Sequence, residues 1–349
     1  MHADGRVASI ARGTGLSLGG IAVGVWLWRA WRRSKPCLFV EPESLRSGDE
    51  EHRLWAKKLT AFIFDIDGVV HTGSGPIEGA AQAIQSIRDA GKRLIFVTNN
   101  ATKSQQDIVN TFSRYDISVQ PDEILTSCIA VANYLRSRGL QGHRVYVVGM
   151  VALCDVLRDR VGMFPFGAED DSEKKREDCL VDFLPRMIPP ASEVAAVVVG
   201  ADFTFNYYKV MRAANYLRQN HSCLLVGTNP DPVALLGPRT FSPAAGSMLQ
   251  CIATAAGREP DMVCGKPSAA FAREVVVDFG LDPTTTCMVG DRTDTDIEFG
   301  HNAGMQTLFV CSGTMTEEDA RGTEELTPSG RSRRPHFIAP SIATLRHIF

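Results

Sequence analysis

The chain has 349 residues, 44% of them hydrophobic, and a formal net charge of −3. Since a domain averages about 150 residues, this length predicts roughly two domains, each with enough apolar residues for a core. The small net charge and the short basic clusters argue against nucleic acid as a partner, because such proteins carry extended basic patches. The nine cysteines are dispersed without a CxxC pair, so we expect reduced thiols in a reducing compartment rather than disulfides or a catalytic cysteine.

The first 53 residues are predicted to lie outside the main fold. They contain an uncharged, mostly apolar run at 13–28, which is followed by four basic residues between positions 29 and 35. The run is short for a membrane-spanning helix, which needs about 20 residues, but the basic residues after it would keep the rest of the chain on the cytosolic side. Arg6 and Arg12 before the run are typical instead of a cleaved signal or transit peptide. A membrane anchor, a targeting peptide and a misassigned start codon all stay open, and so does a cytoplasmic or organellar location.

Two aspartates follow the first predicted strand of the main fold. Ala61–Phe64 is an apolar run suited to a strand that is buried on both faces of a parallel sheet. Asp65 and Asp67 come next, and residues two apart in an extended chain project to the same side. Gly68 lets the backbone approach a bound group closely. The spacing predicts a ligand site beyond the carboxyl end of the strand, although a turn or a fragment of a calcium loop would explain the same residues.

A second predicted strand, residues 93–97, ends in Thr98, Asn99 and Asn100. Their hydroxyl and amide groups can donate hydrogen bonds to phosphate oxygens, while a helix cap is the structural alternative. Between the two strands the chain has room only for a turn and one helix, so no large domain is inserted there.

An inserted domain is expected later in the chain. From Thr98 to Lys266 the chain is several times longer than the roughly 30 residues of one crossover unit. We place the insertion at residues 144–262, where strand-like runs alternate with helical stretches, which predicts an α/β domain with its own small sheet. The charged stretch 169–178 within it is interpreted as a solvated loop or helix. A mixed stretch at 316–335 is expected to be an exposed excursion before the last strand and helix.

Two further segments complete the candidate site. Lys266 lies between a glycine and a proline, and the proline is expected at the first position of a helix, whose dipole would help the ammonium to bind an anion. The predicted strand at 286–289 leads to Asp291, Asp294 and Asp296. Three acids so close together suit a metal ion better than a hydrophobic core.

In this order, the four segments resemble the motifs of the haloacid dehalogenase superfamily of phosphatases. The resemblance is with the branch that holds 4-nitrophenylphosphatases, phosphoglycolate phosphatases and pyridoxal phosphatases, and it covers residues 59–349. It implies a doubly wound, parallel, Rossmann-like α/β sheet formed by residues 54–143 and 263–349, with residues 144–262 as an α/β cap that covers the active site. Further matching segments are 198–202, 205–209, 228–231 and 299–304.

The resemblance implies a role for each matching residue. Asp65 would be the nucleophile that becomes an aspartyl phosphate, and Asp67 would be the general acid and then the general base. Mg²⁺ would be held by Asp65, the backbone carbonyl of Asp67, Asp291 and several waters, because this ion prefers oxygen ligands in an octahedron. The groups that would bind phosphate oxygens are Thr98, Asn99, Asn100 and Lys266.

Three other acids receive lesser roles from the same resemblance. Asp296 is expected to orient Lys266 or a metal-bound water, and Asp294 is expected to be solvated. Asp231 would either orient the cap against the core or touch the substrate, and we favour the first of these.

The implied function is magnesium-dependent hydrolysis of small phosphate monoesters, with a 2-phosphoglycolate-like substrate. Pyridoxal phosphatases carry a His-Pro pair after the matching turn, where this chain has Ala234 and Leu235, which argues against pyridoxal phosphate. Pyridoxal phosphate and a broad or nucleotide specificity stay as alternatives. So does a catalytically silent, membrane-tethered scaffold, although such proteins typically lack the nucleophile or the lysine, and both are present here. The cap surface is a candidate contact for a homodimer.

Overall fold

The computed structural model describes residues 42–46, 49–174, 189–237, 240–322 and 333–349. Residues 42–349 form one compact unit. The apolar run at 13–28 lies outside the described residues, so its interpretation stays a prediction. None of the helices in the described ranges has the length and apolar character that a membrane crossing requires.

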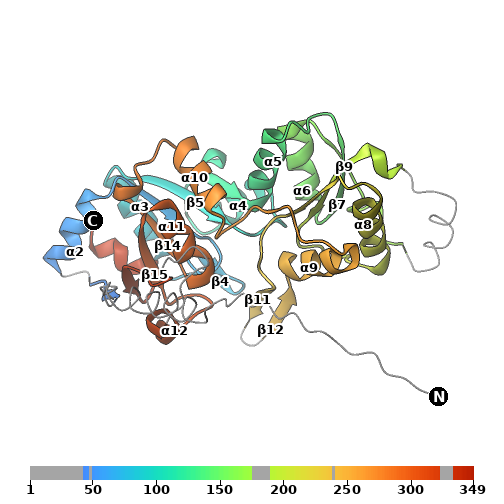
Figure 1. Cartoon of the computed structure of the whole chain (residues 1–349). Helices are drawn as coiled ribbons and strands as arrows, with labels where there is room; N and C mark the ends of the chain where they lie inside the picture. Colours follow the sequence, from blue (N-terminus) through green and yellow to red (C-terminus); the bar gives the residue numbers. More distant parts are fainter. Residues whose placement is uncertain (1–41, 47–48, 175–188, 238–239, 323–332) are drawn as a thin grey trace, which may run out of the picture. The chain divides into compact units, whose positions relative to one another are not determined.

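Seven parallel strands form the first sheet, in the order β1-β16-β15-β14-β2-β5-β6. Strands β5, β14 and β15 of this sheet are labelled in Figure 1. The central strand β2, whose four residues are all apolar and buried, pairs with β14 on one side and with β5 on the other. This arrangement confirms the predicted α/β fold with a parallel sheet covered on both faces. The strands are β1 Glu43–Ser44, β2 Ala61–Phe64, β5 Arg93–Thr98, β6 Ile124–Thr126, β14 Thr286–Gly290, β15 Gln306–Val310 and β16 Phe337–Ala339.

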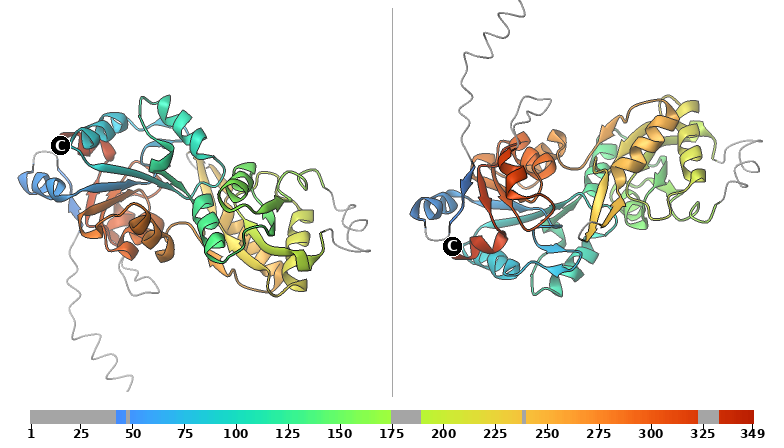
Figure 2. Two further views of the ribbon diagram at one scale, coloured as in Figure 1. Left: turned by 90° about the horizontal axis from the view of Figure 1, so that it is seen from above. Right: turned by 90° about the horizontal axis from the view of Figure 1, so that it is seen from below.

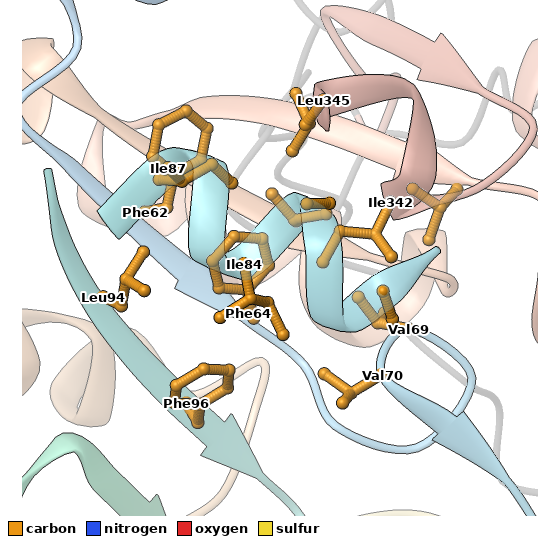
Figure 3. Close-up of a cluster of buried hydrophobic side chains, with 14 of the residues drawn as sticks. Phe62, Phe64, Val69, Val70, Ile84, Ile87, Leu94, Phe96, Ile342 and Leu345 are labelled. Atoms are coloured by element: carbon orange, nitrogen blue, oxygen red, sulfur yellow. The ribbon is translucent and has the colours of Figure 1, made fainter. Parts of the chain in front are cut away.

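The side chains of β2 alternate between the two faces of this sheet. Phe62 and Phe64 pack in one hydrophobic cluster with helix α3 (Ala80–Asp89), as Figure 3 shows. Ile63 belongs to a separate cluster that includes helix α10 (Ala269–Asp278). Fully burying one such side chain contributes about 1.5–3 kcal/mol, so both layers stabilise the strand that ends at the candidate site.

Strand β1 and helix α2 (Glu50–Lys58) lie at the edge of the first sheet, contrary to the expectation that the fold begins at about residue 54. Strand β1 pairs with β16 at the edge of the sheet, and helix α2 follows it. The imidazole of His52 joins the two, because its Nε2 lies 3.0 Å from Glu43 Oε1. A strand of two residues is too short to show an alternating apolar pattern, which is why sequence patterns did not indicate it.

A second sheet of five parallel strands lies within residues 144–263, in the order β13-β10-β9-β7-β8. Helices α8 (Tyr207–Gln219) and α9 (Ala245–Ala256) pack together on one of its faces (Figure 2). The boundaries of the insertion stay a prediction, and β13 crosses the expected end at residue 262. The strands are β7 Arg144–Val148, β8 Phe164–Phe166, β9 Val194–Val199, β10 Leu224–Gly227 and β13 Met262–Val263.

One part of the charged stretch 169–178 is buried rather than solvated. The Asp171 carboxylate accepts a hydrogen bond from the Tyr146 hydroxyl at 2.7 Å, and Arg212 donates to both of its oxygens at 2.9 Å. The interpretation as a solvated stretch is therefore wrong at Asp171, and residues 175–178 lie outside the described ranges. The arginine is 41 positions away in the sequence, too far for a local charge pattern to indicate the pairing.

Helix α12 (Glu317–Gly322) occupies part of the excursion expected at 316–335. Residues 316–319 are exposed as expected, whereas Ala320 is buried and Arg321 donates to the carbonyl of Pro42 at 3.0 Å, so only the end of this helix is packed against the fold. The remaining helices and hairpin strands are α4 Gln105–Ser113, α5 Ser127–Ser137, α6 Val151–Val156, α11 Glu298–Ala303, β3 His71–Thr72 with β4 Gly75–Pro76, and β11 Val233–Gly237 with β12 Thr240–Pro243. Short helical turns lie at Pro121–Glu123, Leu157–Val161, Ala191–Glu193, Pro283–Thr285, Thr293–Ile297 and Ile342–His347.

Candidate active site

Three carboxylates meet at the carboxyl end of the central strands. Asp65 follows β2 directly and Asp291 follows β14, and these strands are parallel neighbours. Asp296 reaches the same point from the helical turn Thr293–Ile297. One oxygen of each carboxylate lies within 4.8 Å of the others, and all three residues are buried. The structure therefore brings together acids that are separated by more than two hundred positions in the sequence.

Lys266 lies among these carboxylates. Its Nζ is 2.6 Å from Asp65 Oδ1 and 2.7 Å from Asp296 Oδ1, and it donates to the carbonyl of Val97 at 3.0 Å. The lysine side chain is only 2% exposed. Helix α10 has Ser268 as its N-cap, so the preceding proline lies before the cap instead of at the predicted first helical position.

The cluster carries more negative than positive charge. Burial raises the pKa of Asp65 above its ordinary value; Lys266 opposes this rise, whereas Asp296 and Asp291 add to it. Burial, together with Asp296, raises the pKa of Asp291 to about 6. Burial alone would lower the pKa of Lys266, but Asp296 and Asp65 outweigh it, so that the pKa rises. Three acids around one ammonium therefore repel one another, and a bound cation would relieve that repulsion.

The donor set fits a divalent cation. Asp291 Oδ2 accepts a hydrogen bond from the backbone of Thr314 at 2.6 Å, whereas its buried Oδ1 has no hydrogen-bond partner within the described ranges. An unpaired carboxylate oxygen beside other acids suits Mg²⁺, which takes oxygen ligands. Gly68, with a φ of +90°, passes so close that a Cβ there would collide with the Asp291 carboxylate. The backbone next to Asp67 is thereby brought close to the acids, which supports its carbonyl as a candidate ligand.

Asp67 faces the open side of the site. Its side chain is 53% exposed, in contrast to the buried Asp65. The Thr98 hydroxyl donates towards Asp67 Oδ2 at 3.5 Å, and His71 Nδ1 lies 4.0 Å from Oδ1. An accessible carboxyl group beside a buried one can exchange protons with a leaving group and with water.

The amide of Asn99 is bonded within the protein. Its Nδ2 donates to Asp231 Oδ2 at 2.9 Å and to the carbonyl of Lys266 at 3.0 Å, and its Oδ1 accepts from the backbone of Lys266 at 2.8 Å. Asn229 donates to the carbonyl of Asn99 at 2.7 Å. In this arrangement, the Asn99 side chain holds the loop of Lys266 and the turn after β10 in place, and a contact of Asn99 with a phosphate oxygen stays a prediction.

Thr98 and Asn100 differ in how their polar groups are used. Thr98 Oγ1 accepts a hydrogen bond from the backbone N–H of Asn100 at 3.0 Å, and the same hydroxyl donates towards Asp67 Oδ2. Asn100 Oδ1 accepts from both the backbone and the hydroxyl of Thr102, at 3.0 and 2.6 Å. The Asn100 carbonyl oxygen thus closes a local turn, which resembles the capping alternative more than a phosphate contact.

Sequence reasoning missed Arg292. Its guanidinium donates to both carboxylate oxygens of Asp294, at 3.1 and 2.8 Å, and lies 3.8 Å from Asp231 Oδ1. Asp294 is therefore paired with an arginine rather than merely solvated. Burial raises the pKa of Asp231, while Arg292 and Asn99 lower it. The available signal was an arginine among acids in a single turn.

Two family models match the chain. The model of the haloacid dehalogenase-like hydrolases matches residues 62–161, and a model described as HAD-hydrolase-like matches residues 263–345. The two matches include the segments that carry Asp65, Thr98, Lys266 and Asp291.

Curated relatives and solved structures agree with these matches. A chloroplastic phosphoglycolate phosphatase of Arabidopsis thaliana is 36% identical over 82% of this chain and 78% of its own length. A glycerol-3-phosphate phosphatase of Gallus gallus is 33% identical over 85% of this chain and 94% of its own length. A glycerol phosphate phosphatase of Mycobacterium tuberculosis, solved in complex with magnesium, has a TM-score of 0.67 and 30% identity, covering 83% of this chain and 77% of that one.

Proposed function

Because this chain belongs to the haloacid dehalogenase-like hydrolases and is a phosphatase, we propose that it hydrolyses small phosphate monoesters with Mg²⁺ through an aspartyl phosphate on Asp65. The observation that carries the proposal is the convergence of Asp65, Asp291 and Lys266 at one sheet edge. Phosphoryl transfer depends mainly on positioning and on offsetting negative charge, and these residues provide both.

Asp65 is the proposed nucleophile. One of its carboxylate oxygens forms a bond to phosphorus while the bond from phosphorus to the ester oxygen breaks, which gives a covalent intermediate. Lys266 is fixed 2.6 Å from Asp65 Oδ1, so its ammonium is placed to donate to a phosphate oxygen at the same point. Water then attacks the phosphorus, which releases inorganic phosphate and regenerates the Asp65 carboxylate.

Asp67 is the proposed proton carrier. Its carboxyl group gives a proton to the departing ester oxygen and later takes one from the attacking water. The 53% exposure of its side chain and the Thr98 hydroxyl at 3.5 Å from Oδ2 support this role. Asp67 can therefore meet both the leaving group and water, whereas the buried Asp65 meets only the phosphate.

Asp65, Asp291 and the backbone carbonyl of Asp67 would hold Mg²⁺. The bound cation would offset the repulsion between the phosphate dianion and the carboxylates. Asp296 stays 2.7 Å from Lys266 Nζ, and this ion pair supports the role of orienting the lysine.

Residues 144–262 are proposed to act as a cap over this site. The turn after β10 supports the proposal, because Asp231 accepts from Asn99 at 2.9 Å and Asn229 donates to the Asn99 carbonyl at 2.7 Å. The carbonyl of Thr228 also accepts from the backbone of Gly265 at 2.7 Å. Such contacts would exclude water from the phosphate and restrict access to small substrates. A homodimer through this segment stays a prediction.

The proposed substrate is an ester similar to 2-phosphoglycolate. The matched relatives named as phosphoglycolate phosphatases support this choice, as does the absence of a His-Pro pair at Ala234 and Leu235. Glycerol 3-phosphate is the second candidate, because relatives that cover most of the chain are named for that activity.

Phosphate release by the full-length chain tests the proposal. We expect hydrolysis of 4-nitrophenyl phosphate that depends on Mg²⁺ and is lost with a chelator. The values of kcat/KM for 2-phosphoglycolate, glycerol 3-phosphate, pyridoxal phosphate and nucleotides then rank the substrates. If no ester is hydrolysed with Mg²⁺ present, the proposed function is wrong and the silent scaffold is favoured. A higher kcat/KM for glycerol 3-phosphate than for 2-phosphoglycolate would leave the reaction standing and replace the substrate.

A further inference from the structure

A second cationic side chain lies beside the site and has no role in the reaction proposed above. Arg292 follows the candidate metal ligand Asp291 directly, and its backbone N–H donates to Asp296 Oδ2 at 3.1 Å. This bond fixes the start of the turn, so the arginine side chain leaves the backbone at a defined place next to the carboxylate cluster.

The guanidinium of Arg292 is held in one orientation by Asp294, and one of its terminal nitrogens remains able to donate to a ligand. Its Nε and one terminal nitrogen donate to the two oxygens of Asp294 at 3.1 and 2.8 Å. The other terminal nitrogen has no hydrogen-bond partner within the ranges that the structure describes. The side chain is 23% exposed, so this edge can be reached by a small molecule. Because the planar guanidinium is already ordered by the carboxylate of Asp294, it can bind the carboxylate of a ligand without a further loss of side-chain freedom.

Arg292 lies on the rim where a leaving group would emerge. Its guanidinium is 3.8 Å from Asp231, which accepts a hydrogen bond from Asn99 at the end of β5. Asp65 and Lys266 are buried, whereas Asp67 is 53% exposed. A phosphate bound at Asp65 would therefore direct its ester group towards the exposed Asp67, on the open side of the site, where Arg292 and the turn after β10 are the candidate contacts.

The charged side chains of Asp67, Asp231, Asp294 and Arg292 determine which ester groups the site can bind. Asp67, Asp231 and Asp294 are acidic and would repel an anionic leaving group. Arg292 is the cation placed among them, and its guanidinium can donate two hydrogen bonds to one carboxylate. An anionic leaving group would thus be accepted only where the arginine can reach it.

We propose that Arg292 is a specificity-determining residue that binds the carboxylate of the leaving group. The enzyme then prefers phosphate esters of small hydroxy acids over esters of neutral alcohols of the same size. This inference rests on the proposed phosphatase reaction and adds to it the group that recognises the substrate. The competing interpretation is that Arg292 only links the turn after β10 to the first sheet, in which case it would affect all esters alike.

Two esters of matched size separate these interpretations. 2-Phosphoglycolate carries a carboxylate where 2-hydroxyethyl phosphate carries a CH2OH group. We expect the wild-type chain to have at least a tenfold higher kcat/KM for 2-phosphoglycolate. Arg292→Gln should lower this ratio by about 10- to 100-fold, mainly through KM, because charge-assisted hydrogen bonds to the carboxylate are lost. Arg138→Gln, at an exposed arginine outside the site, is the matched control and should leave the ratio unchanged.

Each other outcome has a defined meaning. An equal loss for both esters in Arg292→Gln, or no preference in the wild type, overturns the inference. If Arg292→Gln does not fold, as judged by thermal unfolding, Arg292→Lys replaces it: the charge stays but the fork is lost, so an intermediate ratio is expected and an unchanged one contradicts the inference. If the chain hydrolyses 4-nitrophenyl phosphate but does not prefer 2-phosphoglycolate to 2-hydroxyethyl phosphate, only this inference is wrong. If no ester is hydrolysed, the proposed function is wrong.

Discussion

Two buried lysines, one at each sheet, differ in the balance of charge around them. Lys209 of helix α8 lies 2.6 Å from Asp202, and its ammonium also donates to the Thr204 hydroxyl at 2.8 Å. Lys266 is likewise 2.6 Å from an aspartate, Asp65, but it has further acids around it. Both lysines are almost completely buried. The geometry of each single pair is therefore the same, and the surroundings make the difference.

The comparison distinguishes a structural ion pair from a site. At Lys209 one ammonium meets one carboxylate, whose other oxygen accepts from Thr204, so the polar groups are satisfied within the protein. At Lys266 the burial of extra acids raises the pKa of Asp65 and of Asp291. Burying unbalanced charge is unfavourable for folding. An unbalanced cluster at a sheet edge therefore favours a site that binds a cation and a substrate, whereas a balanced pair needs no ligand.

Asp65→Asn gives the largest expected effect. If the carboxylate at Lys266 is the nucleophile, the variant should lose at least about 10⁴-fold in kcat for 4-nitrophenyl phosphate, as is typical when a covalent nucleophile is removed. Its thermal unfolding temperature without metal should not fall, because one of three mutually repelling acids becomes neutral while Asp296 still pairs with Lys266.

Asp122→Asn is the matched control for this variant, since Asp122 is exposed and precedes β6, at the end of the parallel strands opposite to the site. It should retain wild-type kcat and stability. Phosphate release by Asp65→Asn within tenfold of the wild type would refute the nucleophile assignment and with it the functional half of the comparison.

The sequence predicted the unbalanced candidate site better than it predicted the balanced, buried ion pairs of the second sheet, such as that of Asp171 with Arg212. Apolar strands that end in Asp65 and Asp291 indicate a parallel sheet with acids at one edge, because strand direction fixes where those side chains meet. The burial of Asp171 was not predictable, since its partner Arg212 is distant in sequence. The orientation of the Asn99 amide was equally hidden, because spacing along a turn does not say which partner a side chain chooses.

Lys209→Met should cause the largest loss of stability. Removing the ammonium leaves the Asp202 carboxylate buried without its cation, which typically reduces the free energy of unfolding by about 3–5 kcal/mol. Urea unfolding measures this loss, and Lys57→Met at an exposed lysine is the control. The double variant Lys209→Met with Asp202→Asn should recover part of the stability, because the uncompensated charge is then gone.

An unchanged stability in Lys209→Met would remove the contrast between the two lysines. A loss of the same size in the double variant would show that packing, rather than the unpaired charge, stabilises this part of α8. Either result would mean that charge balance does not separate the structural pair from the site.

Mg²⁺ should stabilise the folded protein by binding at the unbalanced cluster of Asp65, Asp291 and Asp296, and not at the Lys209–Asp202 pair. At a concentration one hundred times its dissociation constant, a ligand specific to the folded state adds about 2.7 kcal/mol to the free energy of unfolding. We therefore expect Mg²⁺ to raise the thermal unfolding temperature of the wild type and of the control Asp122→Asn. Asp291→Asn should show little or no rise, because the amide oxygen would keep the bond from Thr314 and an NH2 group, which does not bind cations, would replace the unpaired Oδ1. An equal rise in Asp291→Asn would place the metal elsewhere.

Tyr146→Phe should have the smallest effect and should be confined to stability. The Tyr146 hydroxyl donates to the buried Asp171 at 2.7 Å, but Asp171 keeps both hydrogen bonds from Arg212 when the hydroxyl is removed. One hydrogen bond to a charged acceptor contributes about 1.5 kcal/mol, so urea unfolding should show a loss of this size.

Tyr134→Phe, at a half-buried tyrosine, is the matched control. Because this cluster is balanced and belongs to the second sheet, kcat for 4-nitrophenyl phosphate should stay at the wild-type value. A fall in kcat that exceeds the fall in folded fraction would mean that the balanced cluster also positions the site, and the separation between the two regions would then fail.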